Sequence, residues 1–481
     1  MEANASRTNG VTIRKAPVGL AVLAMVGPSF VWAAEYIGSG EVILATRAGA
    51  ILGTGILWAI VIGVFLKFWI GVSGARYTVC TGEGMIDMFD RMPGPRHWVV
   101  WIVLVVQSVC AILAIGTLAT SAGAFLHSLI PCIDLKYWGW FAAFFAMVVA
   151  WSGVFDVLKI VMSVFVLVIV VGVLYITVRV FPPVAELLSG LTLKVPAVPE
   201  WASSMESVSK NTWEEILPVL GWGAGGFASQ VWYTYWVLGA GYGVAAGRGY
   251  GKAADVAGLQ NMSRETAGRV KGWCRLLYTD ASFAMVLGVV VTGGFLIAGA
   301  RILGSEHLVP KNDDMAEVLS EVFARRWDKM GGFLFKLSGA VAMISTLVGQ
   351  LAGWPRLLAD SCRLCIPGFD RKFAWKTQFR MFLIFFLLTS MIIVVVLGLR
   401  PIFLLKVSSI LEGVLLIAFQ AVWVGVGLYV VMPKMLSKEA YEVLRPSWLF
   451  GVGLLGTFIF FGYLCVTQIP AVLAQLLGGS G

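Results

Sequence analysis

Two carboxylates interrupt the first long apolar run of the sequence, and their spacing suits ion chemistry. Glu35 and Glu41 flank the tripeptide Gly38-Ser39-Gly40. An ionisable side chain at the centre of a membrane costs about 2.5–3.5 kcal/mol on insertion scales, so each one requires a reason. Glycines weaken a helix, and a break at this tripeptide frees backbone carbonyls. Carboxylates beside free carbonyls are hard oxygen ligands, which suit a cation.

The same pattern leaves a structural interpretation open for Glu41. This residue precedes the second half of the interrupted run, where a carboxylate also caps a helix and complements its dipole. We therefore predict that Glu35 and Glu41 are ligands or gate residues, with capping as the alternative for Glu41.

The sixth apolar run repeats the theme. Residues 220–230 contain four glycines within six positions, followed by Phe227, Ala228, Ser229 and Gln230. Close helix packing through small residues is one explanation. However, two glycine-interrupted spans that stand five helices apart are typical of transporters built from inverted five-helix repeats. That architecture places the substrate at both breaks near the bilayer midplane, where Ser229 and Gln230 supply neutral oxygens.

Composition defines the environment in which these residues act. The chain has 481 residues, of which 59% are hydrophobic and 13% charged, whereas a soluble domain has about 25% charged residues. Apolar runs of about 18–25 residues recur along the chain, the length that crosses a lipid bilayer. The net charge of +9 gathers in short loops, as the positive-inside rule requires, so we expect no nucleic-acid partner.

We predict an all-α integral membrane protein with about eleven transmembrane helices. The expected units are a tail at 1–17, a first five-helix repeat at 18–180, a second inverted repeat at 214–432 and an extra helix at 447–475. Helices 1 and 6 are expected to be broken at mid-membrane, and the predicted spans are 18–50, 54–76, 98–125, 137–154, 157–180, 214–239, 273–301, 330–353, 378–398, 402–432 and 447–475.

Basic residues cluster in the loops 240–275, 355–380 and 433–446, while the alternate loops are mixed or acidic. With an odd number of spans, the basic loops share the side of the N-terminus. The positive-inside rule then predicts a multi-pass protein of the plasma (inner) membrane with a cytoplasmic N-terminus and an external C-terminus.

Four more ionisable residues fall inside predicted spans: Lys67, Asp280, Lys336 and Glu412. The two lysines either snorkel to the interface or pair with acids, and the acids have structural or pathway roles. The chain has no Ser-His-Asp, Cys-His or His-Glu-x-x-His arrangement, so we expect neither an enzyme nor a cofactor other than a transported ion. The lone Cys-x-x-Cys in a basic loop, Cys362 and Cys365, is interpreted as incidental.

Several stretches resemble the Nramp family of divalent-metal transporters. Residues 27–30 and 36–41 are similar to its Gly-Pro-Gly-Phe and Tyr-Ile-Asp-Pro-Gly-Asn motifs, and residues 79–82 to its Val-x-Thr-Gly turn. Residues 345–350 resemble part of its eighth helix. The chain is similar in kind to the Nramp-related magnesium transporters, and the resemblance implies the leucine-transporter-like fold of 5+5 inverted repeats.

The resemblance also implies a ligand set. Where the family binds metal through Asp and Asn of the first helix, this chain has Gly38 and Glu41. Aligning the family's Met-Pro-His-Asn of the sixth helix with residues 227–230 puts Ala224 at its carbonyl ligand. The implied metal residues are Glu41, Glu35, Gly38, Ala34, Ala224, Phe227, Ser229 and Gln230.

The departures from the family indicate a hard cation without proton coupling. Loss of the soft methionine removes discrimination against magnesium. Ser229 and Thr234 replace histidines, and the third helix has only neutral groups such as Gln107 where the family has an acid. Weaker pathway or gate candidates are Ser39, Thr234, Asp280, Ser409, which lies near a family glutamine, and Glu412.

The sequence therefore favours a secondary transporter of Mg²⁺ or Mn²⁺-like cations that works by alternating access, without obligatory proton coupling. The alternative is a carrier of an amino acid or polyamine on the same fold, with Trp222, Phe227 and Trp232 lining a larger pocket. A membrane enzyme or receptor is not favoured, because the sequence shows no catalytic constellation and no soluble domain. The oligomeric state is not indicated by the sequence.

Overall fold

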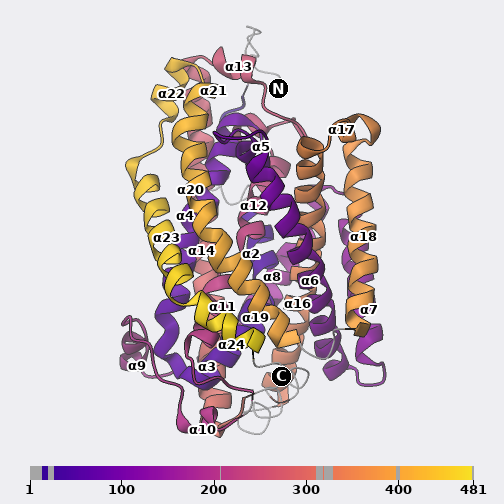
Figure 1. Cartoon of the computed structure of the whole chain (residues 1–481), viewed down its shortest axis with the longest axis vertical. Coiled ribbons are helices and arrows are strands. Elements are labelled where there is room, and N and C mark those ends of the chain that lie inside the picture. The colour runs from indigo at the N-terminus through magenta and orange to yellow at the C-terminus, as the bar shows by residue number, and fades with distance from the viewer. Residues whose placement is uncertain are drawn as a thin grey trace.

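The computed structural model describes residues 13–19, 27–205, 207–309, 318, 329–396 and 401–478. Within these ranges every regular element is a helix, which confirms the all-α prediction. Figure 1 shows the long helices running roughly along the longest axis of the molecule.

The helices follow the predicted spans in order. Helices 1 to 5 are, in order, α2 (Pro28–Tyr36) with η1 (Gly40–Ala45) and α3 (Thr46–Leu52), α4 (Leu57–Thr81), α6 (Trp98–Leu129), α7 (Leu135–Ala150) and α8 (Phe155–Arg179). Helices 6 to 9 are α11 (Trp213–Trp222) with α12 (Phe227–Ala240), α14 (Arg264–Ala298), α16 (Lys329–Cys365) and α18 (Trp375–Val396). Helix 10 comprises α19 (Pro401–Ile410), η6 (Leu411–Leu415), α20 (Leu416–Val426), η7 (Gly427–Val431) and α21 (Met432–Met435), and helix 11 is α23 (Trp448–Thr467).

Shorter elements lie between these spans. They are η2 (Gly53–Ile56), α5 (Met85–Asp90), α9 (Val184–Gly190), α10 (Glu200–Ser203), η3 (Gly243–Ala245), α13 (Val256–Gln260), η4 (Gly299–Leu303), η5 (Gly304–Glu306), α17 (Phe369–Lys372), α22 (Lys438–Leu444) and α24 (Ile469–Gly478).

Length and composition support the expected number of crossings. Among the described residues, eight helical stretches are long and apolar enough to cross a membrane, and α7 is a shorter apolar helix of 16 residues. The remaining crossings are the interrupted helices 1 and 6, so each of the predicted spans has a helical counterpart.

Both predicted helix breaks are present. In helix 1, α2 ends at Tyr36, and a π-helical turn begins at Gly40. In helix 6, α11 ends at Trp222 and α12 begins at Phe227. The second break needs unusual backbone geometry, because Ala224 and Gly225 have φ of 61° and 73°. The breaks thus arise where glycines make a continuous helix unfavourable.

The charged connections sort to opposite ends of the bundle. The elements α13, α17, α21 and α22 lie at one end, and α9 and α10 lie at the other (Figure 1). The three basic loops therefore share one end, as predicted, while the connection that contains Glu186 and Glu200 lies at the opposite end.

Some predicted boundaries need correction. Cys362 and Cys365 lie in the last turn of α16 instead of in a loop, and α14 begins at Arg264, inside the predicted loop 240–275. The last predicted span, 447–475, is divided, because α23 ends at Thr467 and a separate α24 follows. Residues 1–12 of the predicted tail and 20–26 of the first predicted span lie outside the described residues. The division into domains stays a prediction.

Helix 10 crosses helix 6 at one very close approach. A Cβ atom added to Gly413 would overlap the carbonyl oxygen of Gly221, and one added to Gly221 would overlap the carbonyl oxygen of Ser409. Glycine at both positions therefore lets η6 lie directly against the end of α11, beside the helix 6 break.

We expect Gly413→Ala to destabilise the protein by about 1–3 kcal/mol, because the added methyl group overpacks this crossing. Thermal unfolding of the purified protein measures the change. Gly268→Ala is the matched control, since Gly268 is exposed on α14 and its added Cβ meets nothing within 4 Å. Equal unfolding temperatures for the two variants would contradict the close crossing.

Candidate functional site at the two helix breaks

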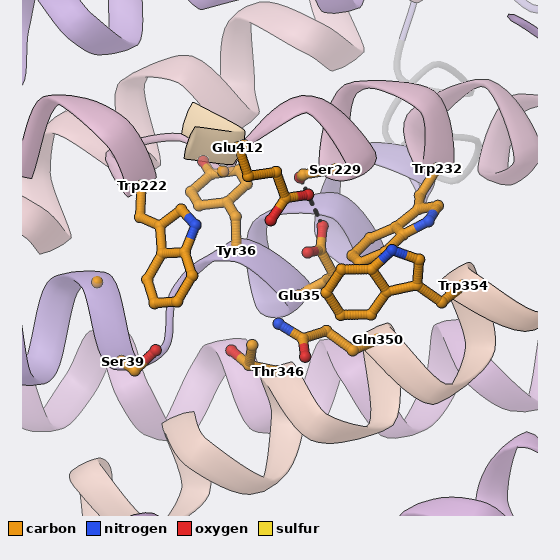
Figure 2. A pocket seen from close by; sticks show the side chains of 13 residues that line it. Glu35, Tyr36, Ser39, Trp222, Ser229, Trp232, Thr346, Gln350, Trp354 and Glu412 are labelled. Atoms are coloured by element: carbon orange, nitrogen blue, oxygen red, sulfur yellow. Dashed lines mark hydrogen bonds between the residues drawn. The ribbon is translucent and has the colours of Figure 1, made fainter. Parts of the chain in front are cut away.

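The two breaks meet at a small buried cavity of about 30 Å³. Figure 2 shows the side chains that surround it, which come from helices 1, 6, 8 and 10. The lining residues are Glu35, Tyr36, Ser39, Gly40, Trp222, Gly225, Gly226, Ser229, Trp232, Thr346, Gln350, Trp354 and Glu412. The predicted meeting of helices 1 and 6 thus creates a shared space.

Glu35 is the helix 1 carboxylate of this cavity. Its side chain is buried, with 3% exposure, and its Oε2 accepts a hydrogen bond from Ser229 Oγ at 2.7 Å, drawn in Figure 2. Ser229 Oγ in turn accepts a hydrogen bond from Trp32 Nε1 at 3.0 Å. Helix 6 therefore contributes the neutral oxygen expected from Ser229, and that oxygen fixes the orientation of the Glu35 carboxylate.

Glu412 is the second carboxylate of the cavity. It lies on η6, and its Oε1 accepts the backbone N–H of Ala228 at 3.0 Å. This contact caps the start of α12, where the helix dipole favours a negative charge. Glu412 and Glu35 are close enough to interact electrostatically, and both lie at the cavity in Figure 2. Two acids from different helices therefore share this small space.

Glu41 does not line the cavity. Its Oε2 accepts the backbone N–H of Gly38 at 2.9 Å, across the helix 1 break. Its Oε1 is buried and has no hydrogen-bond partner among the described residues. The capping geometry that the sequence left open for Glu41 is therefore present, and one carboxylate oxygen is not used by it.

The carbonyls expected to bind an ion are already engaged. Ala34 O accepts from Ser345 Oγ at 2.8 Å, and Ala224 O accepts from Gln230 Nε2 at 3.0 Å. Phe227 O accepts from Gln420 Nε2 at 3.1 Å. None of these residues lines the cavity, although a carbonyl oxygen has a second lone pair that remains for an ion.

Lys67 fills the helix 6 break. Its fully buried ammonium donates to the carbonyls of Gly221, Gly223 and Gly225 at 2.5, 3.0 and 3.0 Å. The sequence singled out this lysine only as a group that snorkels or pairs with acids. Its hydrogen bonds go to backbone carbonyls instead, a partner set that side-chain chemistry alone does not reveal.

Of the weaker candidates, Ser39 and Glu412 line the cavity, Thr234 and Asp280 link helices, and Ser409 bonds within its own helix. Thr234 Oγ1 accepts the N–H of Met85 at 3.2 Å, which joins α12 to the start of α5. Ser409 Oγ donates to the carbonyl of Lys406 within helix 10.

Asp280 joins helices 1, 6 and 7. It is fully buried in α14, and it accepts the N–H of Gly27 at 3.2 Å and the hydroxyl of Tyr233 at 2.9 Å. Both carboxylate oxygens are therefore used in holding α2 and α12, one part of each interrupted helix, to α14.

Helix 8 contributes residues that the sequence did not single out as ligands. Thr346, Gln350 and Trp354 all line the cavity. Their spacing of four residues places them on one face of α16, so the helical period was the signal that could have found them. Gln350 Oε1 is buried without a partner in the described part of the chain.

The described residues contain no group of three or more His, Cys, Asp or Glu side chains assembled to hold a metal. The cavity instead combines two carboxylates with hydroxyl, amide and carbonyl oxygens and three tryptophans. Such a site can attract a cation and coordinate it through oxygen, with the remaining coordination supplied by water.

A buried ionic network closes the end of the bundle that carries α3 and α10. Lys406 Nζ donates to Glu214 at 2.9 Å and to Glu215 at 2.8 Å, and Arg47 lies 3.3 Å from Glu215. These residues join α3, α11 and α19, the parts of helices 1, 6 and 10 beyond the breaks on that side. Sequence reasoning missed the network because each member lies near the end of a predicted span.

A second ionic cluster holds the end of the bundle that carries α5. Arg363 on α16 contacts Asp87 at 2.7 Å and Asp360 at 3.3 Å. Asp87 lies on α5, between spans, and burial raises the pKa of its carboxyl to about 7. The cavity therefore lies between two sets of ionic contacts, one near each end of the bundle.

Comparison with known families agrees with this geometry. The Nramp family model, described as natural resistance-associated macrophage protein-like, matches residues 29–208. The matched part includes the helix 1 break with Glu35 and Glu41, but it does not extend to helix 6.

Curated relatives match over a shorter stretch. The divalent metal cation transporter MntH of Yersinia enterocolitica is 32% identical over 81 residues, and that of Klebsiella pneumoniae is 33% identical over 81 residues. Each match covers 17% of this chain and 20% of the relative, so it spans about a fifth of these transporters.

Solved structures resemble nearly the whole chain. A manganese transporter of Eremococcus coleocola superposes with a TM-score of 0.70 at 17% identity, covering 98% of this chain and 92% of that one. Mhp1, a nucleobase-cation-symport-1 family transporter, superposes with a TM-score of 0.56 at 15% identity, covering 94% and 92%. These matches confirm the predicted fold, and the family match shows that residues 29–208 are similar to the Nramp family.

We expect Lys406→Met to destabilise the protein by about 3–5 kcal/mol, because it leaves Glu214 and Glu215 buried with less positive charge beside them. Thermal or denaturant unfolding measures the loss. Glu442→Gln is the control, since Glu442 and Arg264 form an exposed pair at 3.6 Å that contributes less than about 1 kcal/mol. A loss for Lys406→Met as small as that of the control would show that the buried network holds nothing together.

Proposed function

We propose that this chain is a secondary carrier of a hard divalent cation, Mg²⁺ or Mn²⁺-like, that works by alternating access with its site at the two helix breaks. The observation that carries the proposal is the pair Glu35 and Glu412, which approach one cavity from helices 1 and 10 beside both breaks. Buried carboxylates in a membrane mark ion pathways, because their desolvation is costly without a compensating cation.

The charge of the site favours a divalent ion. Three buried carboxylates, Glu35, Glu41 and Glu412, interact electrostatically with one another or with one ammonium, Lys67. When all four are ionised, three negative charges and one positive charge leave a net charge of −2. A bound divalent cation neutralises that charge.

The donors of the site favour a hard ion. Every side-chain donor atom of the lining that can bind a cation is an oxygen, because the lining has no Met, Cys or His. Oxygen ligands with retained water suit magnesium and manganese, whereas a thioether selects softer transition metals. The similar Eremococcus coleocola protein is a manganese transporter, which is consistent with a divalent substrate here.

The proposed carrier works without obligatory proton coupling in the plasma (inner) membrane, with its N-terminus cytoplasmic and its C-terminus external. Ser229 and Thr234 lie at the positions of the family's histidines. Their uncharged hydroxyl groups form hydrogen bonds with Glu35 and with the backbone. The shared end of the basic loops (Figure 1) supports a cytoplasmic location for that end.

One observation favours a second candidate, the transport of a small organic ammonium compound. Trp222, Trp232 and Trp354 border the same cavity as the two carboxylates (Figure 2). Aromatic faces beside carboxylates recognise alkylammonium groups through cation–π attraction. A cavity of about 30 Å³ holds an ion with little water, but an amino acid or polyamine would require it to expand.

We expect purified protein in liposomes to take up Mg²⁺ or Mn²⁺, and we expect Glu35→Gln and Glu412→Gln each to lower the apparent affinity more than about tenfold. A lost charged ligand removes at least the roughly 1.4 kcal/mol that corresponds to a factor of ten. Fluorescence of a trapped metal indicator measures uptake. Glu439→Gln, an exposed change on α22, should transport normally.

Competition separates the two candidates in the same liposomes. The organic-substrate candidate would be favoured if the liposomes accumulate spermidine or an amino acid but transport no divalent ion. Uptake of that compound should then be lost in Glu35→Gln. Divalent uptake that organic amines do not inhibit would exclude them from the site.

We also expect no proton movement in proportion to divalent uptake, because the cavity has no histidine and Ser229 replaces one. A trapped pH indicator, read beside the metal indicator, measures the ratio. Proton influx stoichiometric with the metal would reject uncoupled transport and would make Glu35 or Glu41 the proton carrier.

A further inference from the structure

The buried ammonium of Lys67 lies where a free cation would be expected to bind. In helix 6 the break exposes the carbonyls of Gly221, Gly223 and Gly225, and Lys67 Nζ donates a hydrogen bond to each of them. Converging backbone carbonyls at a discontinuous helix are the usual ligands of a coupling ion in transporters with inverted repeats. Here a side chain of helix 2 occupies that position.

The hydrogen bonds match the charged form of the lysine. An ammonium group has three N–H donors and no acceptor, and the three carbonyls provide one acceptor for each donor. A neutral amine would have only two donors and a lone pair facing carbonyl oxygens. Lys67 also lies close enough to Glu41 and Glu412 to interact electrostatically with both.

Neighbouring groups hold the lysine in place. Its side chain is fully buried in α4, and its ammonium lies 5.8 Å from the centre of the Phe461 ring on α23. Gly225, whose carbonyl accepts from Lys67, also lines the cavity between the breaks. The lysine therefore borders the proposed transport site without entering it.

We propose that Lys67 is a built-in substitute for a coupling cation: its ammonium occupies a monovalent-cation site made by the helix 6 carbonyls and offsets part of the negative charge of Glu41 and Glu412. Removing the ammonium would open this site to free monovalent cations of similar size and charge, such as Na⁺, K⁺ or NH₄⁺. The wild-type chain needs no such ion, because the lysine is always present.

The test measures the thermal stability of the purified full-length protein in sodium, potassium, ammonium or choline chloride at equal ionic strength. We expect wild-type protein to unfold at the same temperature in all four salts. Lys67→Ala should unfold about 3 °C higher or more in at least one small-cation salt than in choline chloride, because a ligand that binds only the folded state raises Tm. Choline is too large for the space that an ammonium group leaves.

A second variant covers the case in which Lys67→Ala does not fold. Lys67→Gln keeps most of the side-chain volume and two N–H donors, but it removes the positive charge that offsets part of the negative charge of Glu41 and Glu412. It should show the same stabilisation by small cations. Lys336→Gln is the matched control, because Lys336 on α16 also donates to a carbonyl, that of Ser128 at 2.9 Å, away from both breaks. Its Tm should not depend on the cation.

The proposal would be overturned if folded Lys67→Gln unfolds at the same temperature in every salt. It would also be overturned if wild-type protein or Lys336→Gln is stabilised by small cations as much as the Lys67 variants are. The inference rests on the proposed function only for its meaning in transport, since the test measures stability without a divalent ion. Failure of divalent uptake would leave a positive result intact. Normal divalent uptake beside a salt-insensitive Lys67→Gln would reject this inference alone.

Discussion

The structure depends on one constraint: backbone polar groups released inside an apolar bundle must find partners. Within a membrane an unsatisfied N–H or C=O group costs several kcal/mol, so a broken helix persists only where the protein replaces the lost hydrogen bonds. Each break of this chain meets the requirement with a charged side chain from nearby. Glu41 accepts the N–H of Gly38, Glu412 accepts the N–H of Ala228, and Lys67 donates to the freed carbonyls of helix 6. One of these groups, Glu412, also lines the cavity, so the same carboxylate supports a break and adds charge to the site.

This arrangement couples the breaks to the helices around them. Glu412 belongs to helix 10 but caps helix 6, and Ser229 of helix 6 donates to Glu35 of helix 1. Moving any one of these helices exchanges hydrogen bonds at the cavity. At one end of the bundle, Lys406 and Arg47 gather helices 1, 6 and 10 around Glu215. Under the alternating access that we propose, rocking of helices 1 and 6 would have to separate these buried ion pairs.

Sequence reasoning predicted those features that depend on composition and glycine position. Both breaks, the order of the spans and the location of Glu35, Ser39 and Ser229 at or near them followed from local patterns, whereas Glu412 was only a buried charge and a weaker pathway candidate. The partners of the charges did not follow, because they depend on how helices distant in the sequence pack. Lys67 lies 154 residues from Gly221, and nothing in its own span indicates that carbonyls would surround it. Glu41 was a candidate ligand beside Glu35, yet its contact with the N–H of Gly38 and its absence from the cavity lining are tertiary properties.

The fold does not choose the substrate, since a manganese transporter and a nucleobase-cation symporter both superpose on it. The choice must come from the contents of the cavity. Here two carboxyl groups and further oxygen donors favour the proposed hard divalent ion, while the tryptophans favour an organic cation. The volume of the cavity separates the divalent ion from the organic cation as a substrate. A space of about 30 Å³ admits an ion that keeps one or two waters, and the indole rings then act as walls that exclude further water and strengthen the attraction between the ion and the carboxylates. Because Lys67 already donates to the helix 6 carbonyls, we expect the proposed ion on the cavity side of the break, where Glu35 and Glu412 lie.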